Sequence, residues 1–458
     1  METRGEHPFA RCCAESAGRR QGLKTNHEVR DPVYNFIKLD SSERQVLDSA
    51  PMQRLRQIHQ LALTYLVYPG ATHRRFEHSL GVMDLAGRVF DIVTHPDNVH
   101  PKIKPLIPEM REHERGYWRN VLRMAALCHD IGHLPFSHAA EKALLQTGWS
   151  HERLTKELIL GGQMKPIWEA VNPPLRPEHV AKLAVGQKHF SEEPFSDWEA
   201  ILSEIVTGDA FGVDRTDYLL RDSLHAGVAY GRFDYHRLID TLRILPHGAG
   251  DSLEPALGVE EGGLHSAEAL LLARYFMFTQ VYLHPVRRSY DIHLRDFLTE
   301  SLPGGRFPVD LDEFLKMNDN QVMARLLEAA EDPLAPGHDA ARRIALREHF
   351  RVVYELNPDD LRFHGEPGRA LFESLRKQFG EANVRRDEYV PGGGALDFPV
   401  LCRDERVVSS LVMSQVLNKL PVVAVDFLFI MPDMKKEAEL WLAGNRDSIL
   451  RQPVHGED

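Results

Sequence analysis

Cysteine is scarce in this chain of 458 residues, which holds only Cys12, Cys13, Cys128 and Cys402. They form no Cys-x-x-Cys pair, so the sequence predicts neither a disulfide framework nor a cysteine-bound zinc site. At about 150 residues per domain, a chain of this length can bury a large core without such cross-links. We therefore expect a protein of a reducing compartment, the cytoplasm.

The chain also lacks long hydrophobic runs. Its longest apolar stretch, from Val422 to Met431, is interrupted by Asp426, and its N-terminus mixes acidic and basic residues. A membrane-spanning helix needs about 20 consecutive apolar residues. We therefore expect neither a signal peptide nor a membrane span, and no membrane partner.

A surplus of positive charge is missing as well. The chain has 55 Lys and Arg against 67 Asp and Glu, a net charge of −12. With no basic footprint for a long duplex, a phosphate-bearing ligand must be held by a local group of basic side chains. Neither a Walker loop nor a dinucleotide-binding glycine motif occurs in the sequence. These absences favour a small anionic ligand.

Changes in composition along the chain predict three parts. Residues 1–30 are polar and irregular and predict a poorly ordered N-terminal arm. Residues 31–302 are predicted to be mostly helical, with helical apolar spacing over 75–93, an apolar run over 121–128 and a surface loop at 246–263. Residues 303–458 predict a smaller α+β region, with strands at 351–356, 384–390, 397–401 and 422–430 and a helix at 368–379. The predicted fold class is mainly α.

Histidine is abundant, with 24 copies, and the sharpest motif is Cys128 to His133, Cys-His-Asp-Ile-Gly-His, at the end of an apolar helix. Alone, His129-Asp130 can be a helix-end histidine paired with a carboxylate. However, His78 begins an amphipathic helix and Asp214 opens another, so three helices can converge on one ion. Such a nitrogen and oxygen site suits Mn, Fe, Zn, Ni or Mg. A cation held there can lower the pKa of bound water from 15.7 to about 7.

The helix that begins near Asp214 has one polar face. Its further members, at i+3, i+4, i+7, i+8 and i+11, are Asp217, Tyr218, Arg221, Asp222 and His225. A solvated stripe with salt bridges would have the same pattern. Apolar neighbours such as Leu219 and Leu220 favour instead a packed helix whose polar face lines a cavity.

Arginine side chains are grouped near these residues in the sequence. They are Arg74, Arg75, Arg215, Arg274, Arg287 and Arg288. Guanidinium groups bind phosphate oxygens bidentately and stay charged, so the grouping predicts a phosphate site. Scattered surface arginines are the plain alternative.

Taken together, His78, His129-Asp130 and Asp214 resemble the H…HD…D signature of the HD superfamily of metal-dependent phosphohydrolases. The resemblance covers about residues 31–288, most specifically the segments 52–58, 68–71, 73–82 and 128–138. It is to the branch of deoxynucleoside triphosphate (dNTP) triphosphohydrolases, which includes bacterial dGTPase-like enzymes and a vertebrate dNTPase with a sterile-alpha-motif domain. We expect no such extra domain here, and the fold implied is an HD-domain helical core.

This resemblance implies that a divalent metal is held by His78, His129, Asp130 and Asp214. It also implies a catalytic set of His138, Glu141 and His151, although one branch of the family has Asp where Glu141 stands.

The substrate residues implied by the resemblance form two groups. Gln60 and Asp222 would contact the sugar 3′-hydroxyl, Tyr218 would stack beneath the sugar, and Leu61 would crowd the 2′ position and exclude ribose. Positions that contact phosphates match Arg75, His133, Arg215 and Arg274, while Tyr282 and His284 lie in a motif near the base or sugar.

A second nucleotide site is implied by Asp48, Gln53 and Arg56, which resemble residues that bind an activating nucleotide, GTP or a dNTP, between subunits in some members. The same run can be purely structural. A homo-oligomer, dimer or tetramer, is implied as well, and single-stranded nucleic acid stays open as a partner.

We therefore expect a cytoplasmic, metal-dependent enzyme that hydrolyses dNTPs to deoxynucleoside and inorganic triphosphate. His151 or His138 would protonate the leaving 5′-oxygen. The alternatives are a nuclease or phosphodiesterase acting on DNA ends or another nucleotide, since one metal core serves many phosphoesters, and a non-catalytic nucleotide-binding regulator. Control of dNTP pools and antiviral or antiphage defence are both compatible with this chemistry.

Overall fold

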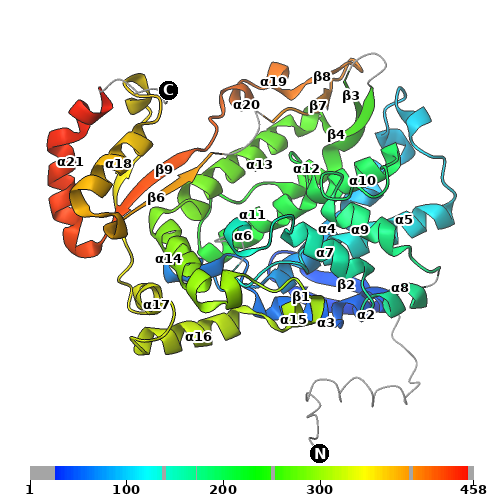
Figure 1. Cartoon of the computed structure of the whole chain (residues 1–458). Helices are drawn as coiled ribbons and strands as arrows, with labels where there is room; N and C mark the ends of the chain where they lie inside the picture. Colours follow the sequence, from blue (N-terminus) through cyan, green and yellow to red (C-terminus); the bar gives the residue numbers. More distant parts are fainter. Residues whose placement is uncertain (1–25, 137–140, 172, 249–252, 391–395, 452–458) are drawn as a thin grey trace, which may run out of the picture.

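The structure is a computed structural model that describes residues 26–136, 141–171, 173–248, 253–390 and 396–451. Its architecture is mainly α, as the sequence predicts. The described helices of the central body lie around one hydrophobic core (Figure 1): α2 (Ser41–Leu47), α3 (Ala50–Arg54), α4 (Arg75–Val93), α5 (Glu112–Cys128), α6 (Glu141–Leu144), α7 (His151–Leu160), α8 (Lys165–Ala170), α9 (Pro177–Val185), α10 (Asp197–Thr207), α11 (Val213–Ala226) and α12 (Tyr235–Thr241). Among the described helices, none is both long and apolar enough to cross a bilayer.

Helix α4 has the bounds predicted from its apolar spacing. Its start is fixed by Glu77, whose Oε1 accepts the backbone N–H of Arg74 at 2.7 Å. Leu80, Val82 and Phe90 are buried in the core. Helix α5 ends at Cys128, directly before His129. The two helices therefore bring His78 and His129 to the same level of the molecule.

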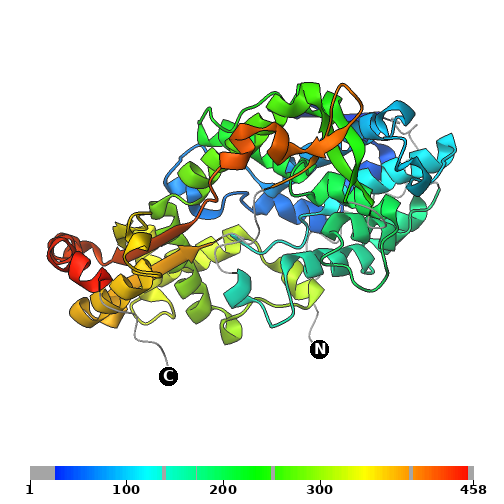
Figure 2. The same ribbon diagram turned by 90° about the horizontal axis from the view of Figure 1, so that it is seen from above.

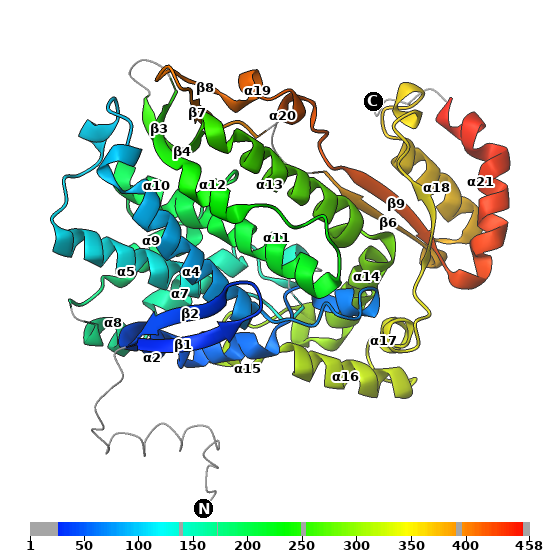
Figure 3. The ribbon, with the colours of Figure 1, turned by 180° about the vertical axis from the view of Figure 1, so that it is seen from behind.

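The N-terminal part of the folded chain is a hairpin, for which no strand was predicted at the start of the mostly helical region. Strand β1 (Asn26–Asp31) pairs antiparallel with β2 (Asn35–Asp40), and Figure 3 shows this hairpin beside α2. Ile37 and Leu39 are buried while their neighbours are not, which is the period of two of a half-buried strand. The predicted arm thus overlaps β1 over residues 26–30, and its residues 1–25 lie outside the described chain.

The surface loop predicted at 246–263 is wrong for most of its length. Strand β3 (Leu242–His247) pairs antiparallel with β4 (Glu254–Glu260), and β4 pairs in parallel with β7 (Pro399–Leu401). Gly258 is a packing residue, because a Cβ there would lie 2.2 Å from the carbonyl oxygen of Pro399. Strand β8 (Val407–Ser409) completes this sheet at its edge.

The predicted helical stretch 266–302 consists of α13 (Leu264–Met277), a π-helical turn η8 (Phe278–Tyr282) and α14 (Pro285–Ser301). Beyond it come α15 (Leu311–Lys316), α16 (Asp319–Glu331) and α17 (His338–Ala345). Phe307, Phe314 and Phe398 belong to the main core, so residues on both sides of the boundary predicted at 302 share it.

A separate C-terminal lobe stands at one end of the molecule (Figures 1 and 2). Its sheet has the order β5 (Arg351–Glu355), β9 (Val425–Ile430), β6 (Val384–Tyr389), all antiparallel. Helices α18 (Pro367–Phe379) and α21 (Lys435–Leu450) share a small core with these strands, and α19 (Ser410–Met413) and α20 (Gln415–Lys419) lead into β9. The strands predicted in this part are confirmed. Arg288 of α14 ties the lobe to the body through two 2.6 Å bonds to Asp387.

Arg123 supports a stability prediction, because its guanidinium is only 6% exposed and pairs with Glu43 at 2.5 Å. Arg123→Ala would leave the Glu43 carboxylate buried and unpaired, so we expect the free energy of unfolding to fall by about 3–5 kcal/mol. Denaturant unfolding would measure this loss.

The matched control is Arg119→Ala on the same helix. Arg119 pairs with Asp91 at 2.8 Å, but the two side chains are 36% and 47% exposed. We expect a loss below about 1 kcal/mol there. Equal losses for the two variants would contradict the importance of the buried pair.

Candidate active site

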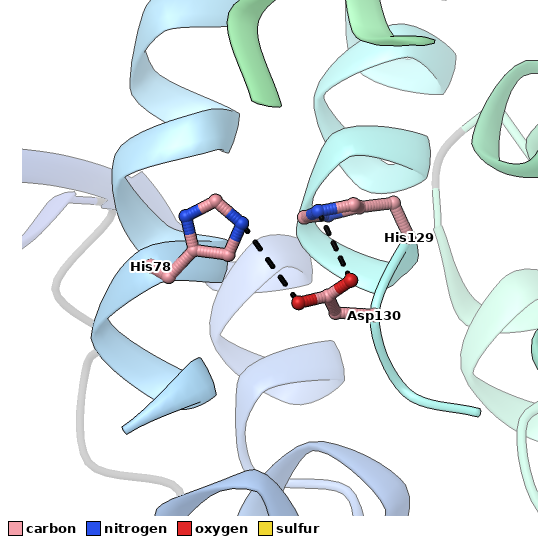
Figure 4. A group of neighbouring side chains, drawn as sticks. All are labelled: His78, His129 and Asp130. Atoms are coloured by element: carbon pink, nitrogen blue, oxygen red, sulfur yellow. Dashed lines mark ion pairs between the residues drawn. The ribbon is translucent and has the colours of Figure 1, made fainter. Parts of the chain in front are cut away.

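Four predicted ligands meet between α4, α5 and α11. His78 projects from α4 towards Asp130, which follows α5 beside His129 (Figure 4). Nε2 of His78 lies 3.0 Å from Oδ1 of Asp214 and 3.8 Å from Oδ2 of Asp130. Nε2 of His129 lies 3.3 Å from Oδ1 of Asp130 and 3.5 Å from Oδ1 of Asp214. Two imidazole nitrogens thus face two carboxylates.

His78 is held in one orientation by Asp217. Its Nδ1 lies 2.7 Å from Oδ2 of Asp217, which is fully buried and also accepts two 2.9 Å bonds from Arg221. Arg221 continues to Asp31 of β1 at 2.8 Å. Since Asp217 accepts the hydrogen of Nδ1, Nε2 is the ring atom directed at the other ligands, the usual arrangement behind a metal-bound histidine.

The charges of this group follow from its burial and pairing. Burial alone would lower the pKa of His78, but hydrogen bonds to Asp214 and Asp217 outweigh it and raise the pKa to about 10. Burial would raise the pKa of Asp217, yet Arg221 and His78 lower it to about 2. Burial opposes ionisation of Asp130 too, but the charges of His129 and Arg75 hold its pKa well below the ordinary value. The carboxylates are therefore ionised at neutral pH.

The residues present fit a divalent cation. His129 donates from Nδ1 to the carbonyl oxygen of Ala126 at 2.8 Å, so Nε2 is the ring atom that faces the carboxylates. That Nε2 is buried and makes no hydrogen bond to any described residue, although the two carboxylates lie close by. Buried carboxylates of this kind need positive charge beside them, and a metal cation can supply it in place of the imidazole protons. The cluster His78, His129 and Asp130 is compact enough to bind one ion.

Gly132 allows α7 to approach these ligands. A Cβ at this position would lie 2.2 Å from the carbonyl oxygen of His151 and 2.3 Å from the backbone nitrogen of Thr155. Thr155 accepts the Gly132 N–H at 3.0 Å and donates to the His129 carbonyl at 3.1 Å. Glycine is therefore needed at this position for close packing rather than for a left-handed backbone, since its φ is not positive.

This packing brings the predicted catalytic residues together. The rings of His133 and His151 stack at 4.1 Å between centroids, and Nε2 of His133 lies 3.0 Å from Oδ1 of Asp130. Nδ1 of His151 lies 2.8 and 2.9 Å from the two carboxylate oxygens of Glu141. His138, the third predicted catalytic residue, lies outside the described residues.

Glu141 sets the protonation of His151. Burial would lower the pKa of His151, but the hydrogen bond and charge of Glu141 raise it above its ordinary value. Burial and the positive charge of Arg75 hold the pKa of the adjacent His133 well below its ordinary value. Glu141 therefore favours the protonated form of His151, while burial and Arg75 favour the neutral form of His133.

A cavity of about 630 Å³ opens onto the cluster. Its walls include predicted residues from five separate stretches of the chain: Gln60, Arg75, His129, Asp130, His133, His151, Asp214 and Tyr218. The cavity is also lined by the loop after α9, by Glu204 and Asp209, and by residues 396–399. Burial raises the pKa of Glu204 to about 7, so this wall holds a carboxyl that is partly protonated at neutral pH.

The residues on the polar face of α11 have two different roles. Asp214 and Tyr218 line the cavity, as the cavity interpretation predicts. Asp217 and Arg221 are instead fully buried and form the network behind His78, which the sequence analysis did not anticipate. Asp222 is also buried and accepts the hydroxyl of Tyr282 at 2.7 Å.

The remaining predicted substrate residues surround this end of α11. The rings of Tyr218 and Tyr282 meet edge to face at 6.1 Å, and Arg215 lies 3.4 Å from the Tyr218 hydroxyl. Burial and the charge of Arg215 lower the pKa of Arg274, so these two cations lie near each other. Leu61 is buried, next to Gln60 in the chain.

The predicted activator residues lie outside the cavity wall. Nε2 of Gln53 donates to the carbonyl of Leu47 at 2.8 Å, and Nε of Arg56 donates to Oε1 of Gln53 at 3.0 Å. Asp48 pairs with Arg44 at 2.6 Å. These are contacts within the chain, and the activator role stays a prediction.

Two of the predicted phosphate arginines have structural partners instead. Arg287 bonds Thr64 and the carbonyl of Tyr282, and Arg288 bonds Asp387.

Sequence reasoning assigned no site role to three side chains that surround the site. It placed Asp217 on the polar face of α11, three residues after Asp214, but did not predict its contact with His78. Glu152, whose Oε1 lies 3.3 Å from Nε2 of His151, directly follows it in the chain. His73, which lies 2.7 Å from Asp222, is 149 residues away in the sequence, so no local spacing reveals this contact.

Known proteins share these features. Residues 75–194 match the family model described as HD domain, and residues 233–367 match the one described as HD associated region. The uncharacterized protein YwfO of Bacillus subtilis is 31% identical over 396 residues, which are 82% of this chain and 81% of that one. A solved structure of a hypothetical protein from Aquifex aeolicus superposes with a TM-score of 0.72 at 31% identity and covers 91% of this chain and 100% of its own.

A named enzyme is also similar. The human deoxynucleoside triphosphate triphosphohydrolase SAMHD1 is 28% identical over 402 residues, which are 79% of this chain. The matched part is 60% of SAMHD1, so the chain spans less than two thirds of that protein.

Asp217→Asn tests the orientation of His78. An amide can donate to Nδ1 and so favours the tautomer whose Nε2 carries the proton, which weakens a cation site. We expect the affinity for Mn²⁺ to fall about 10- to 100-fold. Titration of the chelator-treated protein with Mn²⁺ by calorimetry would measure it.

Asp91→Asn, an exposed carboxylate on α4, is the control and should bind Mn²⁺ as the unmodified protein does. Unchanged Mn²⁺ affinity in the Asp217 variant, with the fold intact by thermal melting, would contradict the role of this contact.

Proposed function

The chain belongs to the HD-domain family of metal-binding phosphohydrolases, and from that premise we propose that it hydrolyses dNTPs to deoxynucleoside and inorganic triphosphate. The observation that carries the proposal is the cavity that joins the His78, His129, Asp130 and Asp214 cluster to Gln60, Arg75 and Tyr218. The cluster would bind a cation, and the other three side chains would contact the phosphate and the sugar. Similarity to SAMHD1 supports the same substrate class.

The metal would be held by Nε2 of His78, Nε2 of His129, Asp130 and Asp214, with Mn, Fe, Mg, Zn and Ni all suited to this donor set. Such an ion supplies a water nucleophile at neutral pH and positive charge at the phosphate under attack. Arg75 fixes Asp130 through a 2.6 Å bond from Nη1 and remains at the cavity wall. The same guanidinium can therefore position a ligand oxygen and a phosphate oxygen.

We assign proton delivery to the stacked pair of His151 and His133. Glu141 favours the protonated form of His151, which lies in the cavity wall, so His151 can give a proton to the 5′-oxygen that leaves the α-phosphate. The neutral ring of His133 stacked on it keeps its plane fixed. Between His151 and His138, the two candidates for the general acid, the contacts of His151 favour it.

Substrate selection would use residues on and around α11. The charge of Arg215 acts on Arg274, and Asp209 lies 3.7 Å from Arg215 on a partly exposed surface, so two guanidinium groups are available for a polyphosphate. Tyr218 offers a face to the sugar, and Asp222 with Gln60 would accept the 3′-hydroxyl. Buried Leu61 leaves no room for a 2′-hydroxyl if it lies against the sugar edge, which would select deoxyribose.

An activating nucleotide and assembly of copies of this chain complete the proposal. Asp48, Gln53 and Arg56 would form part of the activator site, since Arg56 is exposed on the surface. The activation test is turnover of one dNTP with and without GTP.

Product analysis tests the activity itself. Each dNTP, alone and in mixtures with GTP, is incubated with metal-loaded protein beside the matching ribonucleotides and a short single strand. We expect deoxynucleoside and triphosphate in a 1:1 ratio, no turnover of ribonucleotides, and loss of both products in Asp130→Ala. Asp91→Ala, which removes an exposed carboxylate of α4, should keep full activity.

Absence of dNTP turnover in every mixture would refute the proposal, and cleavage of the strand in the same assay would identify a nuclease.

The pH dependence of kcat tests the role of His151. As a general acid His151 must be protonated, and because Glu141 raises its pKa, activity should persist above pH 6.5 before it falls. Glu141→Gln removes the charge, so the alkaline fall should move to lower pH by about 1–3 units. His151→Ala should lower kcat about 10²- to 10⁴-fold. An alkaline limb that does not move in Glu141→Gln would exclude His151 and leave His138 as the acid.

A further inference from the structure

A buried histidine stands behind the carboxylate proposed to bind the sugar. The side chain of His73 has no exposed surface, and its Nε2 lies 2.7 Å from Oδ1 of Asp222. Nδ1 of His73 is buried without a hydrogen-bond partner among the described residues, so the ring proton is best placed on Nε2, where it is donated to Asp222. Tyr282 donates to the other oxygen, Oδ2, at 2.7 Å. The carboxylate is thus held from two sides.

The backbone of His73 contacts Gln60, the other residue proposed to bind the sugar. Its carbonyl oxygen accepts the N–H of Gln60 at 3.0 Å, and the neighbouring residues His59 and Arg74 form a β-bridge. Oε1 of Gln60 is buried and has no hydrogen-bond partner in the described chain, and Gln60 lines the cavity. A buried acceptor of this kind is costly unless a ligand donates to it. His73 therefore contacts both groups proposed to receive the 3′-hydroxyl.

The loop that carries His73 is fixed against α11. A Cβ on Gly70 would lie 2.4 Å from the carbonyl oxygen of His225, so only glycine permits this approach. The ring of His225 stacks on His73 at 4.4 Å with an angle of 14° between planes. Tyr68 donates to the carbonyl of Gln280, two residues before Tyr282. This accounts for the Tyr-Pro-Gly-Ala run at 68–71, to which the catalytic proposal assigns no role.

We propose that His73 is a positioning residue for recognition of the substrate 3′-hydroxyl, acting through the Asp222 carboxylate and the Gln60 backbone. The inference rests on the proposed function, since it assigns the sugar contacts of the same site. The side chain of His73 has no exposed surface and lies behind Asp222, so it does not touch the substrate itself. It fixes the carboxylate rotamer, and the hydroxyl then finds its acceptor already in place.

The test compares a dNTP with the matching 2′,3′-dideoxynucleoside triphosphate, which lacks the 3′-hydroxyl. His73→Phe keeps a flat ring against His225 and removes the bond to Asp222. We expect kcat/KM for the dNTP to fall about 10- to 100-fold and that for the dideoxynucleotide to change less than about twofold. His73→Gln, which can still donate to Asp222, should restore part of the preference. A merely structural role would lower kcat/KM equally for the dNTP and for the dideoxynucleotide, and that result would overturn the inference.

The matched control is His225→Phe, because His225 stacks on His73 but makes no bond to Asp222. Its ratio of dNTP to dideoxynucleotide activity should equal that of the unmodified protein.

If the unmodified protein turns over no dNTP, the proposed function fails. The inference is then tested by calorimetric binding of the two nucleotides to protein kept in chelator. Tighter binding of the dNTP that is lost in His73→Phe supports the role of His73, and equal binding of the two nucleotides to the unmodified protein overturns it.

Discussion

The carboxylate of Asp217, fully buried between α4 and α11, holds His78 in the one orientation that directs its Nε2 at the other ligands. A lone carboxylate at such a depth would be protonated, and Arg221 prevents this by supplying two hydrogen bonds and a charge. Gly81 leaves the space for both groups, since a Cβ there would lie 1.9 Å from Oδ1 of Asp217. Through Asp31, the same network reaches the N-terminal hairpin. The cation site is therefore built on charges neutralised inside the core.

The same construction recurs around every group of the site. Asp130 is fixed by Arg75, His129 by the carbonyl of Ala126, His151 by Glu141 and Asp222 by His73. Each partner fixes the orientation or charge of its group before a ligand arrives, so the charge that a ligand meets is set in advance. Arrangement before binding lowers the cost of ordering side chains when a ligand arrives. A rigid helical body suits this task because its buried partners cannot turn away.

Local patterns in the sequence explain which parts of the fold and of the candidate site could be predicted. The bounds of α4 follow from apolar residues three to five apart, and the ligands follow from an apolar helix that ends in His129-Asp130. The hairpin over residues 26–40 and strand β4 were missed because charged and glycine residues obscure their period of two, and pairing with distant Pro399 stabilises β4. Contacts such as His73 with Asp222 join residues far apart in sequence, so they arise only when the chain is folded.

The residues that line the cavity come from inside and from outside the HD domain match. The HD domain match ends at residue 194 and contains His78, His129, Asp130, His133 and His151, which we propose to surround the reacting phosphate together with Asp214. Gln60, Tyr218 and residues 396–399 line the same cavity from outside that match. One metal core can serve many phosphoesters, so we expect the groups beyond it to select the substrate. Because these groups are held by contacts such as Gly258 against Pro399 and Gly70 against His225, substrate choice depends on how distant segments dock on the HD domain.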